Sequence, residues 1–347
     1  IFNGFRLLNS YKRSKLGVEL SKLALERAQN DISLLVVNTY LNVLFAKENL
    51  NVAKVQAAIS KKQVDAAKQR FEAGIIPKGD LLNTESTAAN DQQNVVIREN
   101  TLTIALLNLA QTLQISAEGF DVEDVDVGSP LAILLYPDSN TVYEKALTIQ
   151  PQIKIAELGI KDADLATDIS KAALYPSLSY TIGAGTSYYN QFNNLLTLPN
   201  GTNQRNPPFF DQISERYQYG FSLSLNVPIF NGFRNKNGVE RAKISKSSSE
   251  LELINQKVQL QQTIEQVFVD TKAVLKAYEA SKVSVKSQKE AFKNAQESFE
   301  LGAMTIFDFD LVRNRLVNAE STLIRNKFDF VFKTKVLEFY YGELNLD

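Results

Sequence analysis

Two long stretches, residues 6–70 and 235–298, constrain the fold of this chain more than any other feature of its sequence. The first has no proline and a single glycine, Gly17, and its interior is rich in Leu, Ala, Lys, Gln and Glu, which favour helix. Apolar side chains recur in it at three- and four-residue steps, as at Leu16, Leu20, Leu23, Leu34, Val37, Leu41 and Leu44. At 1.5 Å per residue such a helix would be roughly 97 Å long. Helices of this length do not fit a compact globule and predict coiled-coil-like assembly.

The same signals for a tight turn and a return helix follow both long helices. Gly74 and Gly302 stand where a helix C-cap is expected. Asp80 and Asp308 come shortly after them and are suitable N-cap residues for a second helix. We therefore expect two antiparallel helical hairpins. Their return helices are predicted over 80–115 and 308–343, and their tips over 72–79 and 300–307.

The two hairpins belong to an internal repeat. Residues 1–6 (Ile-Phe-Asn-Gly-Phe-Arg) recur unchanged as residues 229–234, and 229 − 1 gives an offset of 228. The glycine and aspartate pairs at the tips keep the same offset, so two copies of one structural unit explain the pattern better than chance. A helix and two strands are expected before the second copy. The repeat therefore predicts about 90 residues before Ile1 that hold an equivalent helix and pair of strands.

Between the hairpins, segment 116–138 is acidic and carries Gly128, Pro130 and Pro137. A solvated connecting loop is expected there, because the acidic spacing does not match a calcium-binding EF-hand. A helix is predicted next over 139–173. It should end before Pro176, because the residue before a proline avoids the helical conformation.

Segments 177–188 and 217–227 alternate apolar with small or polar side chains, the period of a β-strand. Their lengths suit the ~9–11 residues of a tilted transmembrane strand, and tyrosines gather at the strand ends as at a membrane interface. The long connection 190–211 is rich in Asn and Pro and fits an outer loop. An antiparallel hairpin with one face on a soluble core is the alternative. The side chains expected to face lipid are Leu178, Tyr180, Ile182, Tyr219, Phe221, Leu223 and Leu225.

No stretch reaches the ~20 apolar residues of a membrane-spanning helix, so a membrane span would require a closed barrel. Two strands cannot close one, and even four fall short of the roughly eight strands of the smallest barrels. Because open strand edges are not tolerated in lipid, symmetric oligomerisation is expected.

The composition argues against an enzyme. The absence of histidine and cysteine removes the usual zinc sites, the Ser-His and Cys-His nucleophile pairs, and the commonest general base. A hydrolase would have to use carboxylates such as Asp308 and Asp310, and nothing in their spacing supports this. Lys+Arg 38 and Asp+Glu 39 are balanced, which argues against a nucleic-acid partner. No metal or cofactor is expected.

In this order the motifs resemble the outer-membrane factor (TolC-like) family, over essentially the whole chain. They are Arg70-Phe71-x-x-Gly74 followed by Asp80-Leu81, Phe299-x-x-Gly302 followed by Asp308, Tyr-Pro-Ser-Leu-Ser at 175–179, and Val-Pro-Ile-Phe-Asn-Gly at 227–232. The resemblance implies an α+β membrane protein. Three protomers would share a 12-stranded barrel in the outer membrane of a Gram-negative bacterium, and their long antiparallel hairpins would form a tunnel in the periplasm.

The resemblance also gives each segment a place. Residues 1–5 would be the end of a barrel strand, 6–115 the first hairpin of the tunnel, 116–138 an equatorial connecting segment, 139–174 a tunnel helix, 175–230 two transmembrane strands with an extracellular loop at 190–211, and 231–347 the second hairpin.

The implied function is the outer-membrane channel of a tripartite efflux or type I secretion system, fed by an inner-membrane pump through a periplasmic adaptor protein. The alternative is a periplasmic coiled-coil scaffold or adaptor without a barrel. In the family the tips dock on the adaptor. Here they would use Gly74, Ile75, Ile76, Gly302, Ala303 and Met304. The pump chooses the substrate, so the sequence does not name it.

Asp308 falls where relatives place a ring of carboxylates at the tunnel constriction, although it equally suits a plain helix N-cap. Asp310 is a candidate addition to this ring, and Asp80 is its equivalent in the first repeat. A basic residue that can latch the closed gate in relatives is replaced here by Met304.

Overall fold

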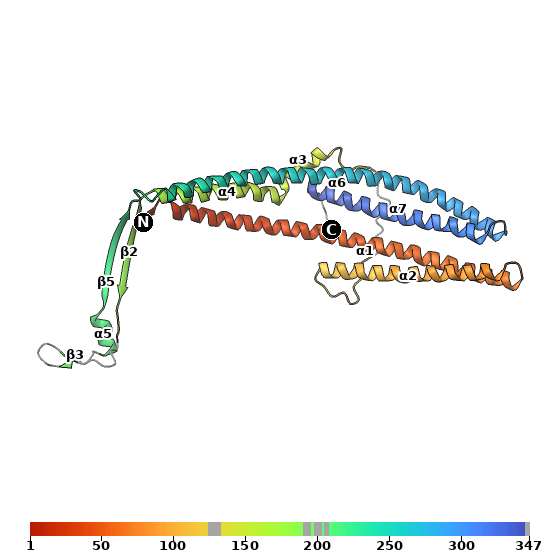
Figure 1. The fold of residues 1–347 in the computed structure, drawn as a ribbon, viewed down its shortest axis with the longest axis horizontal. Coiled ribbons are helices and arrows are strands. Elements are labelled where there is room, and N and C mark those ends of the chain that lie inside the picture. The colour runs from red at the N-terminus through yellow and green to blue at the C-terminus, as the bar shows by residue number, and fades with distance from the viewer. Residues whose placement is uncertain (124–132, 190–195, 198–202, 205–207, 344–347) are drawn as a thin grey trace. The chain divides into compact units, whose positions relative to one another are not determined.

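The computed structural model describes residues 1–123, 133–189, 196–197, 203–204 and 208–343. The helices are α1 (Arg6–Glu72), α2 (Lys78–Thr112), α3 (Ser139–Ile149), α4 (Pro151–Lys171), the 3-10 helix η1 (Ala172–Leu174), α5 (Phe209–Glu215), α6 (Arg234–Glu300) and α7 (Ile306–Tyr341). The strands are β1 (Phe2–Asn3), β2 (Ser177–Gly185), β3 (Leu196–Thr197), β4 (Asn203–Gln204) and β5 (Gln218–Asn226) (Figure 1). In the part of the chain that the structure describes, none of the helices has an apolar stretch long enough to cross a membrane.

The chain divides into two compact units. The first comprises residues 1–21 and 156–253, and the second comprises residues 22–155 and 254–347. Helices α1, α4 and α6 contribute residues to both units.

The first unit contains an antiparallel sheet with strand order β1-β2-β5. Its main pairing runs from Ser177 opposite Asn226 to Gly185 opposite Gln218, and Phe2 of β1 lies opposite Leu178. Directly opposed residues share a face of the sheet, so the register separates the side chains cleanly. One face carries Leu178, Tyr180, Ile182, Ala184, Tyr219, Phe221, Leu223 and Leu225. The other carries only small or polar residues.

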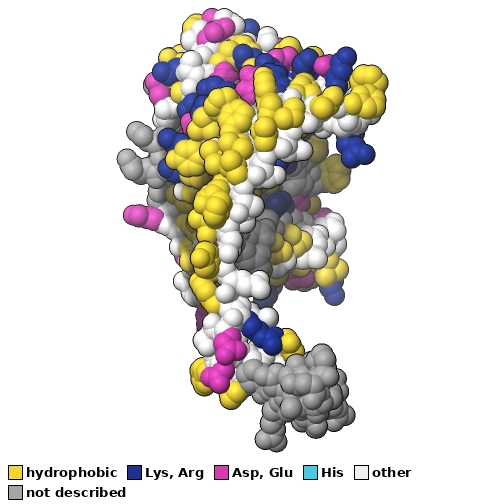
Figure 2. All heavy atoms as spheres, turned by 90° about the vertical axis from the view of Figure 1, so that its left-hand side faces the viewer, with side chains coloured by type: hydrophobic (Ala, Val, Ile, Leu, Met, Phe, Trp, Pro, Cys, Tyr) yellow, Lys and Arg dark blue, Asp and Glu magenta, His cyan; other side chains and the backbone are white. Residues whose placement is uncertain are grey.

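Both faces of this sheet are largely open. Every residue of β5 is exposed, and so are all residues of β2 after Leu178. Figure 2 shows the hydrophobic side chains as a band along this part of the molecule. The seven predicted lipid-facing residues therefore lie on one face, and the alternation expected from the sequence is present over nine residues in each strand.

Two ion pairs join α4 to the N-terminal parts of the long helices α1 and α6. Arg13 of α1 makes a two-point contact with Asp162, with N···O distances of 2.8 and 2.9 Å. Lys246 of α6 lies 2.7 Å from Asp164. Where β1 turns into α1, Gly4 has φ +63° and an added Cβ would lie 2.7 Å from the Ala172 carbonyl oxygen. Only glycine fits this close approach.

The second unit holds most of the two helical hairpins. Tight turns connect α1 to α2 and α6 to α7. Apolar clusters join α1 to α7 through Leu41, Leu44, Ile324 and Phe328, and join α1 to α2 through Leu50, Ala53 and Val95. In α6 the buried side chains follow one another at steps of three, four and seven residues, as at Leu260, Ile264, Thr271, Leu275 and Tyr278. This spacing is typical of the coiled-coil-like packing predicted from the sequence.

The prediction of one helix over 139–173 is wrong. The structure has two helices, α3 and α4, separated at Gln150, whose ψ of 124° is extended. Gln150 precedes Pro151, and the proline ring disfavours a helical conformation in the preceding residue. Asp138 begins α3 as its N-cap, because its side chain accepts a hydrogen bond from the Thr141 N–H.

The connecting regions are described only in part. Residues 124–132 of the acidic segment 116–138 lie outside the described residues, as does most of the loop 190–211. The end of that loop differs from expectation, because residues from Phe209 onward form the short helix α5. Its side chain Gln212 is buried.

Candidate functional site at the hairpin tips

Each long helix ends in the same backbone motif. The Gly74 N–H donates to the Phe71 carbonyl at 2.9 Å, and the Ile75 N–H donates to the Arg70 carbonyl at 2.8 Å. The second tip repeats these bonds, from Gly302 to Phe299 at 3.1 Å and from Ala303 to Ser298 at 2.8 Å. Gly74 and Gly302 have φ of +73° and +74°. These are Schellman caps with glycine in the left-handed conformation, so the predicted glycine C-caps are confirmed.

The tip glycines are not crowded. A Cβ added at Gly74 or at Gly302 would meet no atom within 4 Å. Within the protomer, the Cβ of a substituted residue at either position would cost the strain of a left-handed backbone, about 1–2 kcal/mol, without a clash of that atom.

The predicted N-caps are wrong in both return helices. Helix α2 starts after Pro77, which makes no side-chain cap bond, and Asp80 lies in its first turn. Helix α7 starts after Thr305, whose hydroxyl oxygen accepts from the Asp308 N–H at 3.1 Å. The same hydroxyl donates to the Asp308 carboxylate at 2.7 Å. The hydroxyl of Thr305 caps the helix three residues earlier than the aspartate could, so Asp308 supports the cap instead of forming it.

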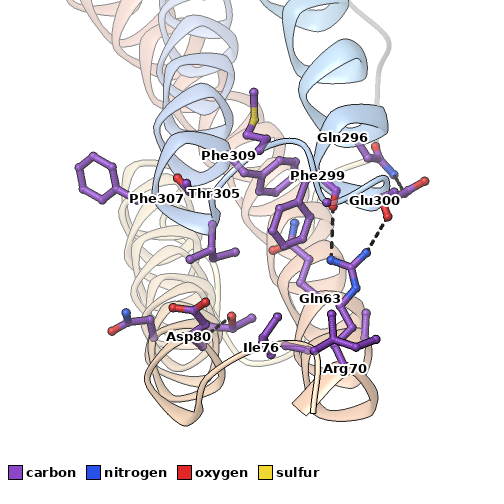
Figure 3. A pocket seen from close by; sticks show the side chains of 18 of the residues that line it. Gln63, Arg70, Ile76, Asp80, Gln296, Phe299, Glu300, Thr305, Phe307 and Phe309 are labelled. Atoms are coloured by element: carbon purple, nitrogen blue, oxygen red, sulfur yellow. Dashed lines mark hydrogen bonds between the residues drawn. The ribbon is translucent and has the colours of Figure 1, made fainter. Parts of the chain in front are cut away.

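Arg70 ties the tip of the first hairpin to that of the second (Figure 3). Its guanidinium donates to the Phe299 carbonyl at 3.3 Å and to the Glu300 carbonyl at 2.8 Å. These are the last carbonyls of α6, where a cation is favoured by the helix dipole. The guanidinium also lies 5.2 Å from the centroid of the Phe299 ring, within the range of a cation–π contact. Phe299 in turn stacks on the buried Phe309.

A pocket of about 990 Å³ lies between the two tips. Its lining includes four of the six predicted docking residues, Ile75, Ile76, Gly302 and Met304. Apolar side chains at its rim are strongly exposed. Ile75 is 71% exposed, Leu301 85% and Phe307 76%. The tips thus present an apolar, water-exposed surface that the protomer itself leaves uncovered.

The structure does not bring the three predicted constriction carboxylates together. Asp80 is half-buried and lines the pocket, whereas Asp308 is exposed in the first turn of α7. Asp310 is half-buried and faces α2, where the Thr87 hydroxyl donates to it at 3.5 Å. Burial raises the pKa of Asp310 even though a cation lies nearby.

That cation is Arg313, a residue that sequence reasoning missed. Its side chain is only 3% exposed. Its Nη1 donates to Asp91 of α2 at 2.9 Å, and its Nε lies 3.6 Å from an oxygen of Asp310. The sequence signal that could have identified Arg313 as buried is its position in the apolar repeat of α7. Arg313 comes four residues after Phe309 and three before Leu316, on the buried stripe of α7.

The sequence matches a family of known proteins. Residues 1–113 and 142–331 match the model of the family described as "Outer membrane efflux protein". The chain is 24% identical over 328 residues to the outer membrane protein TolC of Vibrio cholerae, an alignment that covers 91% of this chain and 69% of that protein. It is 23% identical over 279 residues to the pyoverdine export outer membrane protein OpmQ of Pseudomonas aeruginosa, covering 80% of this chain and 52% of OpmQ.

A solved structure shows the same fold. The outer membrane protein VceC from Vibrio cholerae superposes with a TM-score of 0.78 at 14% identity, covering 99% of this chain and 77% of that one. The family match extends over far more than half of the sequence and confirms the family predicted from the tip and strand motifs. The chain belongs to the outer membrane efflux protein family.

Proposed function

We propose that this protein is one protomer of a homotrimeric channel that receives substrate from an inner-membrane pump through a periplasmic adaptor and releases it outside the cell. Membership of the family makes it an outer-membrane efflux protein of a Gram-negative bacterium, and the periplasmic scaffold is not favoured. The trimer, the shared barrel, the tunnel and the two partners are the proposed part.

The open sheet is the observation that carries the proposal. Its apolar face exposes 79% of Phe221, 66% of Leu223 and 72% of Ile182, so the described residues of the protomer leave this face largely uncovered. Burying such a face in lipid removes the cost of exposing it to water. The opposite face of serine, threonine and glycine suits a water-filled interior. Three copies with four strands each would close a barrel of 12.

The first long helix supports assembly with other copies. Exposed apolar side chains follow one another at seven-residue intervals in α1, at Tyr11, Val18, Leu25 and Ile32. A seam of this spacing is normally covered by a neighbouring helix. Adjacent protomers would cover it in the wall of a tunnel.

The native mass of the protein extracted from outer membranes tests the proposal first. We expect a homotrimer that stays in solution only with detergent, measured by light scattering or native mass spectrometry. A monomer that remains soluble after detergent removal would overturn the shared barrel.

Gly302 tests adaptor docking. Gly302→Leu is expected to abolish transport and to leave the amount of trimer unchanged, because an added Cβ meets no atom of the protomer within 4 Å and the residue lies on the proposed docking surface. Transport is measured as drug or toxin resistance of cells, and trimer as the detergent-extracted species.

Gly119 offers a matched control. It has φ +71° and no atom within 4 Å of an added Cβ, but it lies outside the tips. Gly119→Leu carries the same backbone strain and should transport normally. Normal resistance from the Gly302 variant, or equal loss from both variants, would rule out a docking role specific to the tip.

A further inference from the structure

Helix α7 exposes a polar stripe that begins at Asp308. Its members are spaced three and four residues apart, and all are exposed: Asp308, Leu311, Arg315, Asn318, Thr322, Arg325 and Asp329. A seven-residue period keeps them on one side of the helix, away from the buried Phe309, Arg313 and Leu316.

The same stripe occurs in the first repeat. Subtracting 228 from each number gives Asp80, Asn83, Thr87, Asn90, Asn94, Ile97 and Thr101 of α2. Six of these seven are polar, although most differ from their counterparts in α7. In α2 four of the seven are exposed (Asn83, Asn90, Ile97 and Thr101), and Asp80, Thr87 and Asn94 are half-buried. The stripe of α7 is therefore the more open of the two.

Arg315 is the first cation on the α7 stripe. It comes seven residues after Asp308, which places it on nearly the same side of the helix and about 10.5 Å further along its axis. In the part of the chain that the structure describes, Arg315 has no ion-pair partner, unlike the buried Arg313 on the same helix. Its charge is therefore available to the solvent that the stripe faces.

We propose that Asp308 and Arg315 form an acidic and a basic ring inside the tunnel, one behind the other, so that the constriction is a bipolar ion filter. The inference rests on the trimeric channel proposed above. Three-fold symmetry then gives three carboxylates and three guanidinium groups about 10.5 Å apart along the pore. A ring of Asp308 alone would favour cations, whereas the second ring offsets that preference.

Ionic strength determines whether a passing ion experiences the two rings separately or together. At 0.1 M salt the Debye length is ~10 Å, close to the ring spacing, so a passing ion meets each ring in turn. At 0.01 M it is ~30 Å, and the fields of the two rings overlap and cancel. The wild-type channel should therefore show little preference between potassium and chloride at low salt.

The test is the reversal potential of purified channels in planar bilayers under a potassium chloride gradient around 0.01 M. Arg315→Gln is expected to raise the potassium-to-chloride permeability ratio by about threefold or more. Asp308→Asn should shift it toward chloride, and the double variant should return close to wild type. Lys327→Gln removes a charge from another side of α7, where the ammonium lies 5.8 Å from the Phe328 ring centroid, and should leave the ratio unchanged.

The possible outcomes distinguish a failure of the proposed Arg315 ring from a failure of the proposed trimeric channel. A shift with Asp308→Asn but none with Arg315→Gln would overturn the basic ring and leave the channel standing. Absence of any ion current from the wild-type protein would overturn the channel itself.

The lack of cysteine in the sequence allows a second, independent readout. Arg315→Cys should react with a negatively charged thiosulfonate reagent added to the solution bathing a conducting channel in a planar bilayer. The reaction should change the current stepwise. Lys327→Cys should not alter the current. If the current through the Arg315→Cys channel does not change when the reagent is added, residue 315 lies outside the pore.

Discussion

Replacing Phe221 with arginine is expected to remove the assembled protein from the outer membrane. Phe221 lies near the middle of β5, opposite Ile182, on the apolar face of the sheet. An arginine on the lipid side of a barrel near the bilayer centre costs about 2–4 kcal/mol, and a trimer would carry three copies, about 6–12 kcal/mol in all. A total of this size is comparable with the whole stability of a typical folded protein. The expected measurement is near-complete loss of the trimer extracted from outer-membrane fractions.

The neighbouring residue supplies the control. Ser222 is paired with Thr181 on the opposite face, so Ser222→Arg adds the same charge one position along the same strand. If that face lines a water-filled interior, the variant should assemble in normal amounts. Equal loss from both variants would contradict the assignment of lipid and water faces. Loss from Ser222→Arg alone would mean that the faces are reversed.

Local signals accounted for most of the architecture. Helices α1 and α6 end within a few residues of the predicted bounds, because long proline-free runs of helix formers stop at glycines in the left-handed conformation. Strands β2 and β5 also fall inside their predicted ranges, because period-two alternation places apolar side chains on one face of the sheet and small or polar ones on the other.

The errors came from signals that competed locally. The break at Gln150 follows from Pro151 by the rule that placed the helix end before Pro176, but the helical composition on both sides concealed it. At the second tip, a threonine three residues before the predicted aspartate also has a side chain that can cap a helix. Thr305 takes the N-cap position, and only the structure shows the bond to Asp308 that distinguishes them.

The ion cluster around Arg313 could not be read from the sequence for a different reason. Its partners Asp91 and Asp310 lie on two helices, and the sequence does not give the rotation of one helix against the other. Asp310, a candidate addition to the tunnel ring, lies two residues after Asp308. Two residue steps in a helix turn a side chain by about 200°, which carries Asp310 from the exposed side of α7 to the side that faces α2.

Arg313→Met is expected to loosen the contact between α2 and α7 by about 3 kcal/mol, the lower end for breaking a buried ion pair. The lower end applies because Asp91 and Asp310 keep 22% and 23% of their side chains exposed and can turn toward water. Loss of the cation leaves two carboxylates facing each other. Amide hydrogen exchange around residues 84–95 and 309–316 should accelerate about a hundredfold, since 1.4 kcal/mol corresponds to a factor of ten.

The acidic partners show whether charge or packing is responsible. Adding Asp91→Asn and Asp310→Asn to Arg313→Met removes every charge of the cluster while keeping its volume, and should restore most of the protection. The effect should also depend on pH. Burial already raises the pKa of Asp310, so its protonated form favours the folded state, and protection is lost as pH rises through that folded pKa. After correction for intrinsic exchange, the single variant should therefore recover as the solution is acidified. A loss that neither neutral partners nor acid relieves would mean that Arg313 acts through packing alone, and that the ion cluster does not hold the two hairpins together.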